Sequence, residues 1–147
     1  MEELIKNLPH AQPFALKEQV QYEDGKVVSL TLAQKPGVGM TLFAFDAGEA
    51  ISTHAAPGDA MATILEGAAE ITIDGTPHTL NGGEAIIMPA GIPHAVKALT
   101  VATRIAVLTA RPTTVAQWYS LPGPEGRDAS SPELLELRRA IIHQITQ

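Results

Sequence analysis

The sequence predicts one all-β domain, because short strand-like runs alternate with turn residues over residues 20–110. The runs are rich in β-branched residues or alternate apolar with polar residues, which is typical of a sandwich or a barrel. Asp-Gly and Asn-Gly pairs separate several of these runs, and glycine supplies the positive φ that tight turns need. The length of 147 residues and the hydrophobic content of 45% fit a single core.

Three segments are expected along the chain. Residues 1–19 form an N-terminal segment whose composition allows a short helix over residues 2–8, residues 20–112 form the barrel, and residues 113–147 form a linker and a C-terminal helix. Within the barrel, we expect strands at residues 26–34, 38–46, 60–66, 69–74, 84–88, 93–98 and 101–110. Asp74-Gly75 lies between two such runs and is therefore the strongest hairpin signal.

The C-terminal helix is indicated by its start signal and by its apolar stripe. Ser130 and Glu133 have the spacing of a capping box, and Pro132 is tolerated in a first turn. The stripe then follows at helical spacing and consists of Leu134, Leu137, Ile141 and Ile145. Two interpretations stay open: the helix covers an open face of its own barrel, or it packs on a partner subunit of a homodimer.

Charge and composition exclude several classes of protein. The formal net charge of −6 repels polyanions, so nucleic acid is not an expected partner. The absence of cysteine excludes disulfides, thiolate nucleophiles and cysteine-bound zinc. The first residues are acidic and interrupted by Pro9, unlike a secretion signal, and no apolar run is long enough to span a bilayer. We therefore expect a cytoplasmic protein without a membrane partner.

Two glycine-and-histidine motifs carry the strongest functional signal. The first runs from Gly48 to His54 and continues to Gly67, and the second contains Gly83, a Pro-x-Gly turn and a histidine. The four matching residues of the second motif are Gly83, Pro89, Gly91 and His94. In order and separation, the pair resembles the two motifs of the cupin family. The resemblance implies a small, single-domain cupin barrel of the jelly-roll type.

The sequence departs from the family pattern at three positions. Ala56 stands where the family has a second histidine, Ala60 or Met61 where it has a glutamate, and Ala98 where it has an asparagine. Two of the usual four metal ligands are therefore missing. If the motifs align, strand alternation turns these positions toward the barrel interior together with His54 and His94. We then expect a roomy, weakly polar cavity around the two histidines.

A metal could still bind to His54 and His94 with one carboxylate. Asp59 is the candidate, since two imidazoles and a carboxylate form a facial triad that leaves positions open for other ligands. The alternative for Asp59 is a turn residue whose carboxylate accepts backbone N–H groups. The alternative for the histidines is a pair of core imidazoles without metal. His78 lies on a strand near the Asn81 turn, where a surface role is expected.

Two functions follow from the resemblance. The first is a small-molecule-binding cupin with a pocket around the two histidines, which holds a divalent transition metal (Fe, Mn, Ni, Cu or Zn) or none. The second is a metal-dependent enzyme, either an oxidoreductase of the dioxygenase type or an isomerase of a small organic substrate. The family includes proteins of both kinds, so the fold alone does not decide between them.

Overall fold

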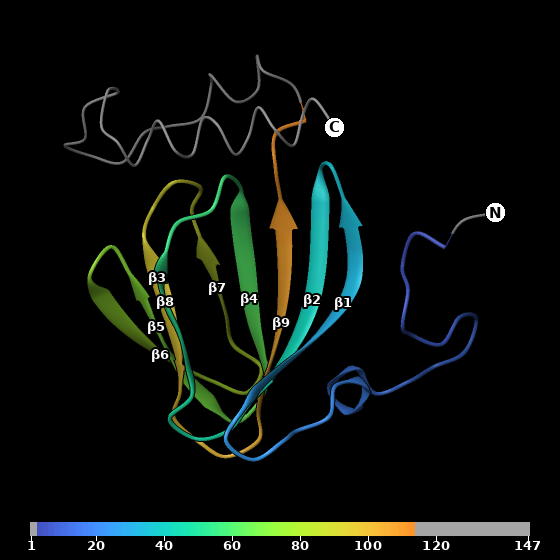
Figure 1. Cartoon of the computed structure of the whole chain (residues 1–147), viewed down its shortest axis with the longest axis horizontal. Coiled ribbons are helices and arrows are strands. Elements are labelled where there is room, and N and C mark those ends of the chain that lie inside the picture. Colours follow the sequence, from blue (N-terminus) through green and yellow to red (C-terminus); the bar gives the residue numbers. More distant parts are fainter. Residues whose placement is uncertain (1–2, 114–147) are drawn as a thin grey trace.

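Two antiparallel β-sheets face each other in the computed structural model, which describes residues 3–113 (Figure 1). The five-stranded sheet has the order β1 (Val27–Lys35), β2 (Val38–Phe45), β9 (Thr103–Ala110), β4 (Asp59–Glu66) and β7 (Ala85–Met88). The four-stranded sheet has the order β3 (Ala50–His54), β8 (His94–Ala98), β5 (Ala68–Ile73) and β6 (Thr76–Asn81). The predicted all-β fold is confirmed.

The helices expected from the sequence have different outcomes. Residues 3–8 form bends instead of a helix, so the short N-terminal helix is wrong for the part of it that the structure describes. A short 3-10 turn, η1 (Leu16–Gln19), follows later in this segment. The predicted C-terminal helix lies outside the described residues. Within residues 3–113, no helix has the length and apolar character to cross a membrane.

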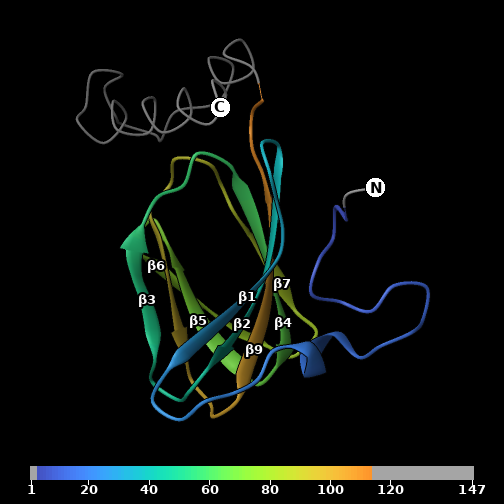
Figure 2. The ribbon, with the colours of Figure 1, turned by 45° about the vertical axis from the view of Figure 1, so that its right-hand side comes forward.

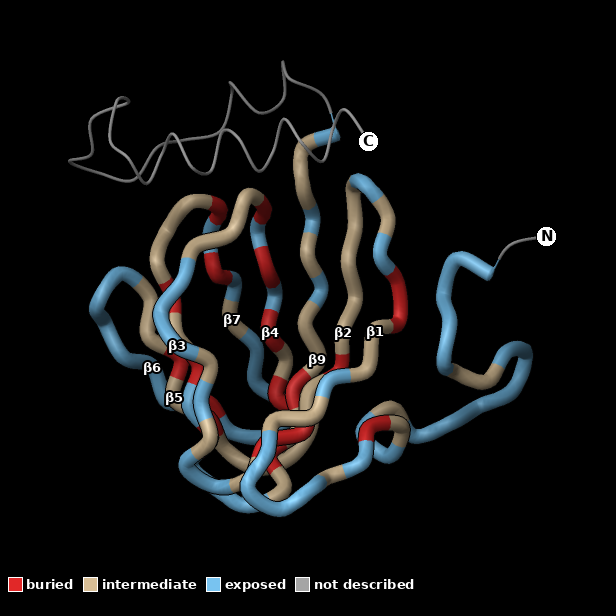
Figure 3. Tube along the Cα trace, in the orientation of Figure 1, coloured by how far each residue is buried: buried red, intermediate tan, exposed pale blue. Residues whose placement is uncertain are grey.

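The main core fills the space between the two sheets. Alternate residues of each strand point inward, so Ile64 of β4 and Ile71 of β5 meet in one cluster with Phe45 and Ile105. These four side chains are almost completely buried, and the buried segments in Figure 3 lie mainly where the sheets approach each other. Burying large aliphatic and aromatic groups contributes about 1.5–3 kcal/mol for each side chain.

A second cluster lies on the outer face of the five-stranded sheet, on the side away from the four-stranded sheet. The N-terminal arm, residues 3–26, runs along this face (Figure 2). Its side chains Leu8, Leu16 and Val20 pack with Leu32 of β1 and Leu42 of β2. Only one side of the arm contacts the sheet, and most residues in its first half are exposed to solvent. The outer face of this sheet is thus partly buried by the chain's own arm.

Two hydrogen bonds fix the arm to β1, which is an edge strand. The Lys6 N–H donates to the Leu32 carbonyl at 2.7 Å, and the Asn7 side-chain amide donates to the Thr31 carbonyl at 2.7 Å. Leu32 lies at a break in the β1–β2 register, where Thr31 and Ala33 have partners and Leu32 has none. The arm therefore uses the carbonyl of Leu32, which has no register partner, and the carbonyl of its neighbour Thr31.

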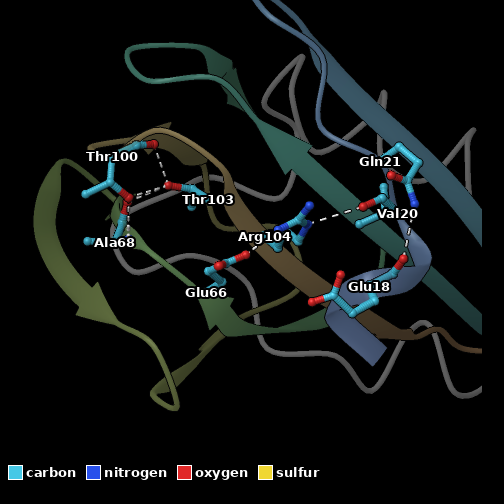
Figure 4. Close-up of polar contacts among 8 residues, drawn as sticks. All are labelled: Glu18, Val20, Gln21, Glu66, Ala68, Thr100, Thr103 and Arg104. Carbon is cyan, nitrogen blue, oxygen red and sulfur yellow. Dashed lines mark hydrogen bonds and ion pairs between the residues drawn. The ribbon is translucent and has the colours of Figure 1, made fainter. Parts of the chain in front are cut away.

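Arg104 of β9 ties the arm to the sheet from the other end (Figure 4). Its Nε–H donates to the Val20 carbonyl at 3.2 Å, and its Nη1 forms an ion pair with the Glu66 carboxylate. Glu66 is the last residue of β4, so this ion pair fixes the end of that strand. In the same figure, Thr103 bonds to Thr100 and to the Ala68 carbonyl at the start of β5.

Candidate functional site

The two histidines are cross-strand neighbours because of the turns that precede them. His54 is the last residue of β3, His94 is the first residue of β8, and the two are register partners. The Pro89-Ala90-Gly91 turn sets the start of β8: Gly91 has φ of 75°, and its N–H donates to the Ala56 carbonyl at 2.9 Å. Only glycine adopts this φ without strain, which explains the glycine in the second motif.

The imidazole rings meet through their Nε2 atoms, which are 3.1 Å apart. The ring centroids are 4.3 Å apart, and the rings are inclined at 70°. Each Nδ1 faces a backbone carbonyl two residues earlier: Ser52 at 2.9 Å from His54, and Ile92 at 3.2 Å from His94. The same local arrangement therefore orients both rings.

The contacts at Nδ1 favour one tautomer in each ring. A carbonyl oxygen only accepts, so an Nδ1 that donates to it carries the proton, and a neutral imidazole has no second N–H. In that tautomer both Nε2 atoms are unprotonated, and their lone pairs oppose each other at 3.1 Å. Either an additional proton or a cation between the rings removes this repulsion.

The surroundings of His94 disfavour the additional proton. His94 is buried, with 5% of its surface exposed, whereas His54 is exposed. Burial lowers the pKa of His94 below its ordinary value, and the neighbouring His54 lowers it further, although the Ile92 carbonyl opposes this shift. A neutral His94 ring, whose Nε2 faces the Nε2 of His54, is therefore favoured near neutral pH.

Two of the positions that depart from the family pattern, Ala60 and Ala98, are buried in the core between the sheets, which confirms that they face inward. Met61, the alternative glutamate position, is 39% exposed, and Ala56 lies in the loop between β3 and β4. Ala60 has Met88 and Thr109 as its register partners on the neighbouring strands. This wall contains no donor nitrogen or carboxylate. The roomy cavity expected here stays a prediction.

Asp59 is not grouped with the two histidines. It is the first residue of β4, its side chain is exposed, and its Oδ1 accepts the Ala90 N–H at 2.8 Å. Within residues 3–113, no three side chains of His, Asp or Glu lie close enough together to hold a metal ion. In this structure Asp59 thus has the alternative role considered for it, as an acceptor for a backbone N–H in the turn before β8.

The other described histidines lie away from the pair. His78 is exposed on β6, which is two strands from β8, and its register partner is Ile71. The His10 Nε2 contacts the Ile5 carbonyl in the N-terminal arm at 2.8 Å. Sequence reasoning missed the Ser52 and Ile92 carbonyls, because backbone groups leave no mark in the sequence.

The structure therefore defines a class of protein: a small two-sheet β-barrel with two contacting histidines, one buried and one exposed. Residues 41–109 match a family model described as a cupin domain. A cupin superfamily protein from Desulfitobacterium hafniense is 30% identical, with a TM-score of 0.70; the match covers 74% of this chain and 98% of that one. The chain belongs to the cupin superfamily.

Two further solved structures are similar. A conserved protein of unknown function from Streptococcus pyogenes is 41% identical, with a TM-score of 0.73, and the match covers 76% of this chain and 96% of that one. A cupin 2 conserved barrel domain protein from Leptotrichia buccalis is 41% identical, with a TM-score of 0.65; the match covers 67% of this chain and 47% of that one. Comparison with curated proteins gave no match.

Proposed function

We propose that this cupin binds a small molecule at a divalent transition metal held by His54 and His94. The observation that carries the proposal is the pair of Nε2 atoms 3.1 Å apart, each ring being fixed by a carbonyl at Nδ1. A metal-ligating histidine commonly donates its other N–H to a carbonyl or carboxylate, which fixes the ring for coordination. The arrangement of both rings follows this rule.

The separation of the two nitrogens also fits a shared ion. Two nitrogens that each lie about 2.0–2.1 Å from one ion are about 3 Å apart when they occupy adjacent coordination positions. Imidazole nitrogen is a suitable ligand for Zn, Cu, Fe and Ni. Mn, which the family resemblance also allows, is a harder ion that prefers oxygen ligands. The bound metal would supply a Lewis acid that attracts oxygen or nitrogen atoms of the ligand.

The rest of the proposed site consists of what the chain places around the rings. Alanine at positions 56 and 60 supplies no further ligand, so the remaining coordination positions belong to water or to the small molecule. Asp59 would join them only by giving up the Ala90 N–H, since its Oδ1 accepts that group. The apolar wall formed by Ala60, Met88 and Val96 suits the apolar part of a ligand.

Elemental analysis of untagged, full-length protein tests the proposal. We expect a near-stoichiometric transition metal in the wild type, loss of the metal in His54→Ala and in His94→Ala, and retention in His78→Ala. His78 is the matched control, because it is a barrel histidine that lies two strands from β8. A wild-type protein that stays metal-free after incubation with each of Fe, Mn, Ni, Cu and Zn would overturn the proposal.

The enzymatic alternative rests on the same geometry. Two protein ligands leave open positions on a metal, as in sites where both substrate and oxygen bind. If the protein is an oxidoreductase or an isomerase, turnover of a small organic substrate should disappear together with the metal in His94→Ala. A homodimeric state and a cytoplasmic location, both expected from the sequence, also stay proposals.

A further inference from the structure

An apolar row crosses the outer face of the five-stranded sheet. Met40 of β2, Leu108 of β9, Met61 of β4 and Ile87 of β7 are successive register partners, so they lie side by side on four neighbouring strands. Met61 and Leu108 are each 39% exposed and Ile87 is 58% exposed. We call these four residues the outer row.

The N-terminal arm and the outer row enclose a groove. Its volume is about 110 Å³, and Leu8 and Leu16 of the arm line it opposite Met40, Met61 and Leu108. The arm packs on β1 and β2 and reaches β4 through η1, whereas Ile87 at the β7 end of the row is exposed. The groove therefore opens onto an apolar surface that continues across the sheet.

Exposed apolar side chains concentrate on this side of the protein. Of the eight large hydrophobic residues that are exposed within residues 3–113, three belong to the outer row and three to the arm. The arm residues are Leu4, Ile5 and Phe14, whereas the two others, Leu99 and Val101, follow β8. A soluble domain seldom exposes apolar groups so close together unless they form a binding surface.

Charge indicates which partner fits the surface. The outer row and the next row of register partners, Leu42, Ala106, Thr63 and Ala85, contain no ionisable side chain. The whole chain has a net charge of −6, so two copies repel each other through most surfaces. An uncharged face of this kind can meet the same face of a second copy without this repulsion.

We propose that the outer row and the adjoining arm form the surface on which a second copy of this chain docks. The same patch on both copies gives an isologous, two-fold dimer. β2, β9 and β4 have 8 residues each and β7 has 4, so with about 4.8 Å between strands they present a face of roughly 450 Å², part of which the arm covers. The arm extends this face toward the roughly 800 Å² that each partner of a stable complex buries.

Sedimentation equilibrium of the full-length chain tests the proposal with a matched pair of variants. Ile87→Lys places a charge in the outer row, and Val101→Lys places one at a residue of equal exposure (58% and 60%) outside it. We expect the wild type and Val101→Lys to be dimers and Ile87→Lys to be monomeric, with wild-type circular dichroism. A dimeric, folded Ile87→Lys variant would overturn the proposal, and so would a monomeric wild type.

A second measurement does not depend on how Ile87→Lys folds. The chain has no cysteine, so Ile87→Cys and Val101→Cys each create a single labelling site. Alkylation at position 87 should become slower as protein concentration rises, whereas the rate at position 101 should stay constant. Slow labelling at position 87 at every concentration would instead show that residues 114–147 of the same chain cover the row. Metal content tests the histidine site separately, because the outer row belongs to the five-stranded sheet and both histidines belong to the four-stranded sheet.

Discussion

Replacing Gly67 by alanine tests how tightly the corner between β4 and β5 is packed. Gly67 has φ of 81°, and an added Cβ would lie 2.5 Å from Thr100 Oγ1 and 2.8 Å from Thr103 Oγ1. Gly75, in the β5–β6 hairpin, has nearly the same φ of 83° but nothing within 4 Å of its Cβ position. The two glycines therefore differ mainly in the space around them.

The two contributions to the loss of stability can be worked out separately. A left-handed backbone costs an alanine about 1–2 kcal/mol, and this cost applies to Gly67→Ala and to Gly75→Ala alike. Overpacking adds about 1–3 kcal/mol at position 67 only. Thr100 cannot move without loss, because its Oγ1 accepts the Ala68 N–H at 3.0 Å and contacts Thr103 Oγ1 at 2.8 Å.

Urea denaturation of both variants, followed by circular dichroism, measures the difference. We expect the free energy of unfolding to fall by about 1–2 kcal/mol in Gly75→Ala and by about 2–5 kcal/mol in Gly67→Ala. Equal losses in the two variants would refute the reasoning, since the threonines would then adjust to the added methyl group without cost.

Three further predictions concern the arm and the histidine site. Arg104→Met leaves a buried carbonyl and a carboxylate without their donor, so it should lower the free energy of unfolding in urea by about 1–3 kcal/mol. The control, Lys26→Met, removes only an exposed ion pair and should lower it by less than about 1 kcal/mol. In metal-free protein, the lowered pKa of His94 means that the unfolded chain takes up a proton first, so stability should fall as the pH drops below about 6.5. Thermal unfolding between pH 8 and 5 should show this fall in the wild type and a smaller one in His94→Gln; equal falls would contradict it. Asp59→Asn keeps an oxygen for the Ala90 N–H, so elemental analysis should find unchanged metal content, and loss of the metal would instead identify Asp59 as a ligand.

The sequence predicts most strands correctly, because their apolar residues alternate with polar ones and the apolar residues are the ones that become buried. The Asp74-Gly75 hairpin is present, with both residues in the left-handed region. β3 and β6 do not correspond to any of the predicted strand ranges, although the sequence places His54 and His78 on strands. Both elements bury little: one residue of β6 is buried, none of β3 is, and Pro77 interrupts the β6 pattern. A strand without a buried face does not alternate apolar and polar residues, so its sequence does not predict a strand.

The site was predictable only in the parts that the motifs fix. The motifs identified His54 and His94, because glycine turns at fixed spacing set where each strand begins or ends. The partner of Asp59 was not predictable, since its contact with Ala90 depends on how β4 meets a turn 31 residues later. Likewise, the inward face of residues 38–46 became known only from the β2–β9 register, which directs Phe43 and Phe45 into the core.

The hydrogen bonds of the arm to β1 also bear on how this protein avoids aggregation. An edge strand with free carbonyls is a template for another strand, and pairing at such an edge has no closing symmetry. Lys6 and Asn7 occupy the carbonyls of Leu32 and Thr31. Loss of the first residues would therefore remove these two bonds and leave the edge of β1 open to pairing with a strand of another chain.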